Sequence, residues 1–177
     1  ITVGGDVTVK EVIRLVEKYF GSIPRGPQVN KMAPMIPKVD RTRFVSYVDN
    51  YARFPIFAKV YATVPNYHKD MAALQCLSQI LGQGNNSVLY QQLTKKQQAL
   101  QAFAGSQLYE LGGEFTFFIV PMPGKPLPTA YSLFKQAMDS FEVRGVTDED
   151  IERFKGGIES QLITGLQSVG GKVSQLA

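Results

Sequence analysis

Segments with the period of a β-strand and segments with the period of an α-helix arrive in pairs along this chain. The clearest strand is residues 56–64, where one side of the alternation is wholly apolar: Ile56, Ala58, Val60, Ala62 and Val64. Two more strands are predicted at about 100–109 and 114–121, and the short glycine-rich connection between them is typical of an antiparallel hairpin. This order favours the α+β class, with a mostly antiparallel sheet and helices packed on one face.

Apolar residues at helical spacing predict five helices, and shorter apolar runs predict two further strands at residues 1–5 and 43–48. The helices are expected at 9–20, about 67–81, 88–93, 130–141 and 151–169. Thr8 with Glu11 forms a capping box for the first helix, Ser87 caps the third, and Thr147 with Asp150 begins the last. Residues 24–40, rich in proline and methionine, are predicted to be a linker.

The length of 177 residues suits a single domain with a sizeable core. The sequence opens inside an apolar stretch and stops inside an amphipathic one, whereas natural termini are usually polar. We therefore expect residues 1–177 to be one domain excised from a longer chain.

Composition excludes several functions. One histidine, His68, and one cysteine, Cys76, cannot supply the three protein ligands of a zinc site, so neither a metal nor a catalytic site is expected in this chain. The net charge of +4 comes from scattered lysines and arginines rather than a basic patch, which argues against nucleic acid as a partner. No apolar run approaches the roughly 20 residues of a membrane span.

Three segments, in this order, resemble the C-terminal, non-catalytic domain of the pitrilysin or insulinase-like zinc metallopeptidases, the inverzincins. Gly4-Gly5-Asp6-Val7 with residues 15–24 is similar to the family's "G-D-V … L-x-E-K-Y-F-G-x-I-P". Residues 82–93 resemble "G-G-G-x-S-S-R-L-Y-x-x-L", and residues 145–153 resemble "G-V-T-x-E-E-L-E-R". The bacterial processing-peptidase-like zinc proteases are the subgroup that fits best, and the bacterial periplasm is then the expected compartment.

The resemblance implies a clam-shell around a peptide-binding chamber. In the family, the zinc site lies on a preceding domain in the motif H-x-x-E-H, which this sequence lacks. Zinc is therefore expected in the parent's catalytic domain and no cofactor in this chain. The implied partners are that catalytic domain, in the same parent or a paired subunit, and an unstructured peptide.

Active members of the family carry an arginine and a tyrosine seven residues apart after the "L-Y-x-x-L" helix, where they reach the substrate. Those positions fall on Thr94 and Gln101, so both side chains are missing. Lys95, Lys96 or Phe103 are the candidates to replace them, and a solvated helix end is the alternative for the two lysines. The loss favours a divergent subgroup or a copy without catalytic support.

The alternation in residues 56–64 also allows two interpretations of which sheet face is buried. In one, Val60 faces the core, and an exposed apolar patch lines a chamber; the patch consists of Phe57, Tyr61, Phe103, Tyr109 and Phe118. In the other, these aromatic residues are ordinary core. Candidate substrate-binding residues are thus Tyr61, Lys95, Lys96 and Phe103.

Two functions follow. The first is a non-catalytic C-terminal domain of a zinc metalloendopeptidase that holds peptide against a catalytic domain. The alternative is a structural or binding domain of a family member without proteolytic activity, which the absent arginine and tyrosine favour.

Overall fold

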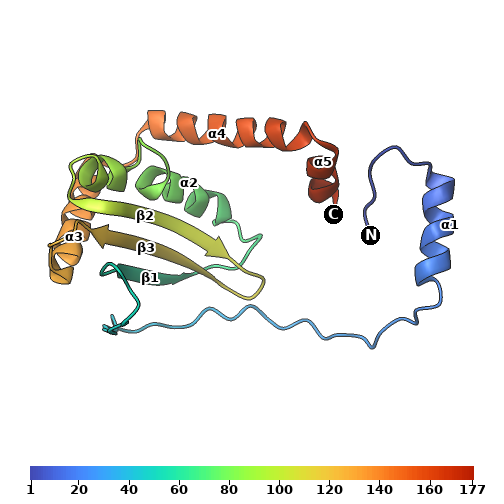
Figure 1. The fold of residues 1–177 in the computed structure, drawn as a ribbon, viewed down its shortest axis with the longest axis horizontal. Helices are drawn as coiled ribbons and strands as arrows, with labels where there is room; N and C mark the ends of the chain where they lie inside the picture. Colours follow the sequence, from blue (N-terminus) through green and yellow to red (C-terminus); the bar gives the residue numbers. More distant parts are fainter. The chain divides into compact units, whose positions relative to one another are not determined.

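The computed structural model describes all residues, 1–177, and its ribbon is drawn in Figure 1. The chain divides into two compact units, Met32–Phe154 and Ile1–Lys31 with Lys155–Ala177, each of which is described by itself. The elements in chain order are α1 (Val9–Phe20), β1 (Phe57–Thr63), α2 (Met71–Gly82), the π-helical turn η1 (Tyr90–Thr94), β2 (Ala99–Leu108), β3 (Gly113–Pro121), α3 (Leu127–Arg144), α4 (Asp148–Leu166) and α5 (Val169–Leu176).

The larger unit is built on a three-stranded antiparallel sheet in the order β1-β3-β2. β3 lies in the middle, with Phe117 paired to Lys59 of β1 on one side and to Ala104 of β2 on the other. The register of β2 shifts once, between Ala99 and Gln101. The predicted β2–β3 hairpin and the α+β class are confirmed.

One face of the sheet carries the hydrophobic core because α2 packs on β2 and α3 packs on β3. Its buried members are Leu81, Leu89, Leu93, Ala99, Ala104, Phe115, Phe117, Ile119, Ala130, Leu133, Phe134 and Ala137. The last residue of α2, Gly82, approaches β2 so closely that a Cβ there would overlap the backbone of Ala104. We call this side the helix face.

The opposite side of the sheet, the open face, is not covered by these helices. The pairing register places Ala58 and Val60 of β1, Phe118 of β3 and Phe103 of β2 on it. Val60 is 56% exposed, so the interpretation that puts Val60 in the core is wrong. Phe57 faces the other way, where it contacts the rings of Tyr131 and Phe134.

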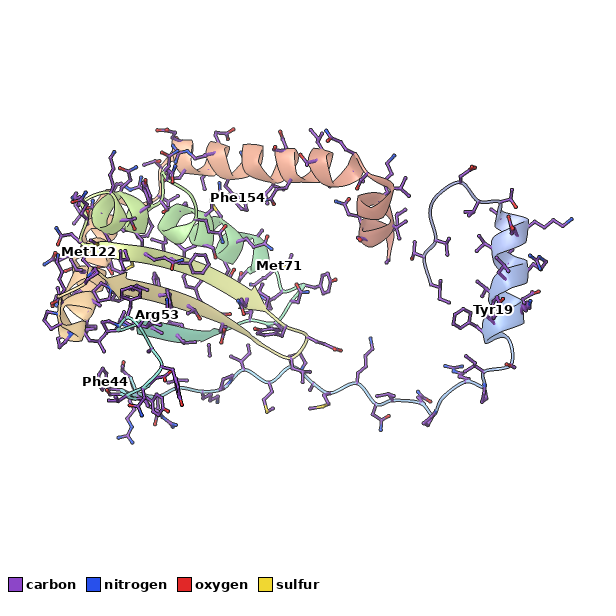
Figure 2. The ribbon with its side chains drawn as sticks, in the orientation of Figure 1. Tyr19, Phe44, Arg53, Met71, Met122 and Phe154 are labelled. Atoms are coloured by element: carbon purple, nitrogen blue, oxygen red, sulfur yellow. The ribbon has the colours of Figure 1, made fainter.

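The short strands predicted at 1–5 and 43–48 do not form. Phe44, labelled in Figure 2, is 86% exposed on an extended segment outside the sheet, and Tyr47 is exposed as well. An alternating sequence becomes a strand only when a neighbouring strand pairs with its backbone. Residues 43–48 have no such neighbour in this chain, so their β-type composition has no effect.

The smaller unit contains α1, the greater part of α4, and α5. Thr8 caps α1 as predicted, because its hydroxyl accepts the Glu11 N–H at 3.3 Å. The expectation of one helix through residue 169 is wrong, since α4 ends at Leu166. Ser168 adopts an extended backbone and caps α5 by accepting the Gly171 N–H at 3.0 Å. A serine hydroxyl that satisfies a free N–H at a helix start favours a new helix over continuation.

Candidate functional site

The two lysines selected from the sequence lie just after a π-helical turn. The N–H of Lys95 donates to the carbonyl of Tyr90 at 2.8 Å, and the N–H of Gln98 donates to the carbonyl of Leu93 at the same distance. These are five-residue steps, which are rare and often mark functional sites. Gln97 between them has φ +54°, a left-handed conformation uncommon outside glycine.

Each lysine pairs with a glutamine one helical turn earlier rather than with a carboxylate. The Lys95 ammonium donates to Gln91 Oε1 at 3.0 Å, and the Lys96 ammonium donates to Gln92 Oε1 at 2.6 Å. Neither lysine forms a salt bridge. No carboxylate therefore pairs with either lysine, and each ammonium keeps two further donor positions.

Lys96 also lines a surface hollow of about 350 Å³, and Lys95 does not. The hollow lies between the turn at residues 92–98 and one face of α3. Its lining is Gln92, Leu93, Lys96, Gln98, Leu133, Gln136 and Ala137. Three glutamines of this lining were not singled out from the sequence. The only sequence signal for Gln92 and Gln98 is the high glutamine content of residues 91–101, and Gln136 lies outside that stretch.

Phe103 lies on the open face and is 40% exposed. Its ring covers Gly105, where a Cβ would collide with the end of the phenyl group. Phe103 pairs with Phe118 and therefore stands in one row with Ala58 of β1. This row, with Val60 beside it, makes an apolar strip across the uncovered sheet.

Tyr61 is 44% exposed but belongs to the helix face. It pairs with the buried Phe115, and its ring meets Phe117 edge-on at 6.1 Å between centroids. The ammonium of Lys59 lies 5.1 Å from the Tyr61 centroid, a cation–π contact. The structure thus brings Phe103 and Tyr61 to opposite faces, and a single patch holding both is wrong. The reason is that alternation separates the two faces of a strand without saying which face the helices cover.

The two positions that the resemblance assigns to an arginine and a tyrosine fall on Thr94 and Gln101. Thr94 is half-buried in η1, and Gln101 is exposed near the start of β2, where it pairs with Val120. Lys96 lies two residues after Thr94, on the turn that joins η1 to β2.

A polar cluster, the polar corner, lies where α3 leads into α4. The sequence predicts only its capping residues, Thr147 and Asp150. The buried carboxylate of Asp150 accepts the Thr147 N–H at 3.2 Å and the Arg144 guanidinium at 2.8 Å, and Arg153 lies 3.4 Å away. The Thr147 hydroxyl accepts the Asp150 N–H in return, which completes a capping box. Burial alone raises the pKa of Asp150, but these hydrogen bonds and the Arg144 charge outweigh it, so the pKa of Asp150 is lowered.

The donor set of this chain does not fit a zinc ion. The Nδ1 atom of His68 accepts the Asp70 N–H at 3.2 Å, so this histidine is engaged in its own turn. Cys76 is buried on α2, and its thiol pKa is raised by burial and by the nearby charge of Asp150, which opposes thiolate formation. No group of three or more His, Cys, Asp or Glu side chains comes together to hold a metal. No helix is sufficiently long and apolar to span a membrane.

Fold and donor set together define an α+β domain with helices on one sheet face and without a metal centre. Comparison with known families identifies it: residues 1–157 match the family described as the peptidase M16 inactive domain, to which the chain belongs. The resemblance inferred from the three sequence segments is thereby confirmed.

Individual relatives agree with this family. The chain is 28% identical over 174 residues to the zinc protease PqqE of Helicobacter pylori, covering 95% of this chain and 38% of that protein. The crystal structure of a protease from Helicobacter pylori matches with a TM-score of 0.81 at 26% identity, over 97% of this chain and 42% of that one. A peptidase M16 inactive domain structure from Pseudomonas fluorescens shares the fold, with a TM-score of 0.73 at 18% identity, over 97% and 40% of the two chains. The chain thus spans about two fifths of the length of these relatives.

Proposed function

We propose that this chain is the non-catalytic part of a zinc endopeptidase and holds an extended peptide against a catalytic domain. That catalytic domain is supplied by the same parent chain or by a paired subunit, and it carries the zinc. The family match and the similarity to a zinc protease support the reaction class.

The observation that carries the peptide-holding role is the apolar strip on the open face. Val60 and Phe103 are each exposed by two fifths or more, with Phe118 half-buried between them. Water against such a strip is unfavourable, since apolar area gains roughly 25 cal/mol per Å² when it is covered. An unstructured peptide with apolar side chains gains this free energy, and the sheet gives it a flat surface to lie on.

This role requires binding and no chemistry from the chain itself. The chain has no zinc ligand set, and its single thiol is buried with a raised pKa. Proteolysis then depends on the neighbouring domain, and the contribution of this chain is to position the peptide.

The alternative is a structural or binding domain of a parent that has no proteolytic activity. Thr94 and Gln101 favour it, because neither can supply the cation or the phenol that active relatives place there. The two functions differ in whether the parent cleaves peptides at all.

The deciding experiment uses the full-length parent with an unstructured peptide substrate. We expect cleavage that a zinc chelator abolishes. Phe103→Ala is expected to raise KM severalfold with kcat nearly unchanged, the result of losing equal binding to substrate and transition state. Tyr61→Ala is the matched control, since it removes an equally exposed ring from the other sheet face. Absence of chelator-sensitive cleavage would reject the peptidase role and leave the alternative.

A further inference from the structure

The hollow beside Lys96 has an apolar floor. Leu93, Leu133 and Ala137 form it, and all three are buried members of the main core. Its volume of about 350 Å³ falls in the range of about 300–1,000 Å³ that is usual for small-ligand sites. An apolar group that enters the hollow therefore meets packed core rather than water.

The rim of the hollow holds one cation and no carboxylate. It consists of Gln92, Lys96, Gln98 and Gln136. A second cation stands close by, because the ammonium of Lys125 donates to Gln98 Oε1. Lys125, like Lys96, has no salt bridge. The local charge is positive and uncompensated, so an anion is the ligand that this rim favours.

The amide orientations strengthen the preference for an acceptor. Gln92 turns its oxygen to Lys96, which leaves its NH₂ group free to donate. Both polar atoms of the Gln98 amide form hydrogen bonds. Its oxygen accepts from the Lys125 ammonium, and its nitrogen donates to the Lys96 carbonyl at 3.3 Å. The groups that remain unused on the rim are the ammonium of Lys96, the Gln92 NH₂ group and the Gln136 amide, whose oxygen is the one side-chain acceptor among them. A carboxylate accepts through both oxygens and donates nothing, so it fits this set.

The backbone that presents these groups is unusual. The π-helical turn and the left-handed Gln97 both belong to the segment that forms one wall of the hollow. A non-glycine residue in a left-handed conformation costs free energy and persists where the surroundings require it. Here it directs the chain from η1 into β2 while Lys96 stays within one turn of Gln92.

We propose that this hollow binds a carboxylate group of a peptide, and that an adjacent apolar side chain of the same peptide packs on the apolar floor. Lys96 pairs with the carboxylate and Gln92 donates to it. The carboxylate is either the C-terminus of the peptide or an Asp or Glu side chain within it. This inference goes beyond the proposed function, because the hollow belongs to the helix layer and not to the apolar strip of the open face. Binding to the hollow needs no peptidase activity.

The test measures binding of fluorescently labelled short peptides to the 177-residue chain at physiological salt. The first peptide ends in Ala-Leu with a free carboxylate, and the second has the same sequence with a C-terminal amide. We expect the acid to bind about tenfold more tightly, the difference that one charge-assisted hydrogen bond gives. Lys96→Gln is expected to remove this preference and leave the weaker amide affinity unchanged.

Lys95→Gln is the matched control. It deletes the same charge one residue away, from a side chain that also pairs with a glutamine but does not line the hollow. It is expected to keep the tenfold preference. Equal affinity of acid and amide, equal effects of the two lysine variants, or no binding of any peptide overturns the proposal. Melting curves of both variants confirm that neither unfolds the chain.

A third peptide, Glu-Leu with a C-terminal amide, separates the two sources of the carboxylate. Binding as tight as that of the free acid assigns the hollow to an acidic side chain, and weak binding assigns it to the peptide C-terminus. The cleavage assay on the parent is independent. Cleavage by the parent together with equal binding of acid and amide contradicts the carboxylate site alone, whereas acid-selective binding without cleavage contradicts only the peptidase role.

Discussion

The two faces of the central sheet are both apolar in sequence, yet only one of them is the core. On β1 the wholly apolar row of Ala58 and Val60 lies on the open face, while the mixed row of Phe57, Lys59 and Tyr61 lies under the helices. On this strand the helix face takes the larger rings, which fill the space between sheet and helices, as Phe57 does against Phe134 with 5.7 Å between ring centroids. On β2 the order is reversed, since the Phe103 ring lies on the open face and the small Ala102 and Ala104 lie under the helices. Neither apolar character nor ring size alone therefore assigns a row of a strand to the core.

The largest expected effect is the difference in stability between an aspartate introduced on the helix face and one introduced on the open face. Ile119→Asp places a carboxylate at a fully buried position on β3 of the helix face. An unpaired buried charge costs several kcal/mol, roughly the whole stability of a domain, so this variant is expected to be unfolded. Val60→Asp on the open face is expected to cost about 1 kcal/mol or less, the cost of a poor strand former at an exposed site. Urea unfolding followed by circular dichroism measures both, and equal damage from the two substitutions would show that the open face is covered within this chain.

The second effect tests how closely the helices approach the sheet. Gly82→Ala introduces a methyl group against the Ala104 backbone, which cannot move aside without breaking the β2 pairing. We expect a loss of about 3 kcal/mol, the upper range for overpacking. Gly156→Ala in α4 is the control, because nothing lies within 4 Å of the added Cβ, and it is expected to leave stability unchanged or slightly raised. A neutral Gly82→Ala in thermal unfolding would mean that α2 stands further from the sheet.

The third and smallest effect concerns the polar corner at the end of the helix layer, which the open face lacks. Asp150→Asn is expected to cost about 2 kcal/mol at neutral pH, through weakened hydrogen bonds to a charged group. The pKa of Asp150 is lowered in the folded chain, so this stabilisation is present above the ordinary carboxyl value of about 4 and is lost as pH falls through the lower folded-state pKa.

The difference in unfolding free energy between the parent chain and Asp150→Asn should therefore shrink below about pH 4. Asp148→Asn removes an exposed carboxylate from the same first turn and is expected to cost less than about 1 kcal/mol. A cost for Asp150→Asn that stays constant from pH 7 to pH 3 would contradict the assigned charge pairing.

Local patterns in the sequence predict much of this fold. The hairpin of β2 and β3, the cap at Thr8 and the capping box of Thr147 and Asp150 are each determined by residues within a few positions of one another. The unformed strand at residues 43–48 and the reversed faces of β1 depend on which neighbours are present, and alternation within one segment carries no information on that. Residues 151–169 were predicted as one helix because the apolar period continues through Ser168, where a single hydroxyl begins a new helix.

In the candidate site too, some features follow from the local sequence and others depend on tertiary packing. Lys95 and Lys96 are adjacent in sequence and equivalent there, but the π-helical turn gives only Lys96 a place on the hollow. Gln136 reaches the same hollow from α3, about forty residues further along the chain, and no local pattern connects the two segments. The resemblance to a family locates the positions of the absent arginine and tyrosine, and the suggestion that Lys96 or Phe103 replaces them stays a prediction.

The single cysteine gives this chain a built-in reporter of its own opening. Cys76 is buried on α2, and burial together with the nearby charge of Asp150 raises its pKa, which keeps the thiol protonated at neutral pH. A thiol reagent reaches the buried sulfur when the structure around α2 opens, so the rate of alkylation follows the population of that opened form rather than the reactivity of the sulfur. Because no second thiol competes, any ligand or neighbouring domain that tightens the helix layer will be visible as slower labelling at this one atom.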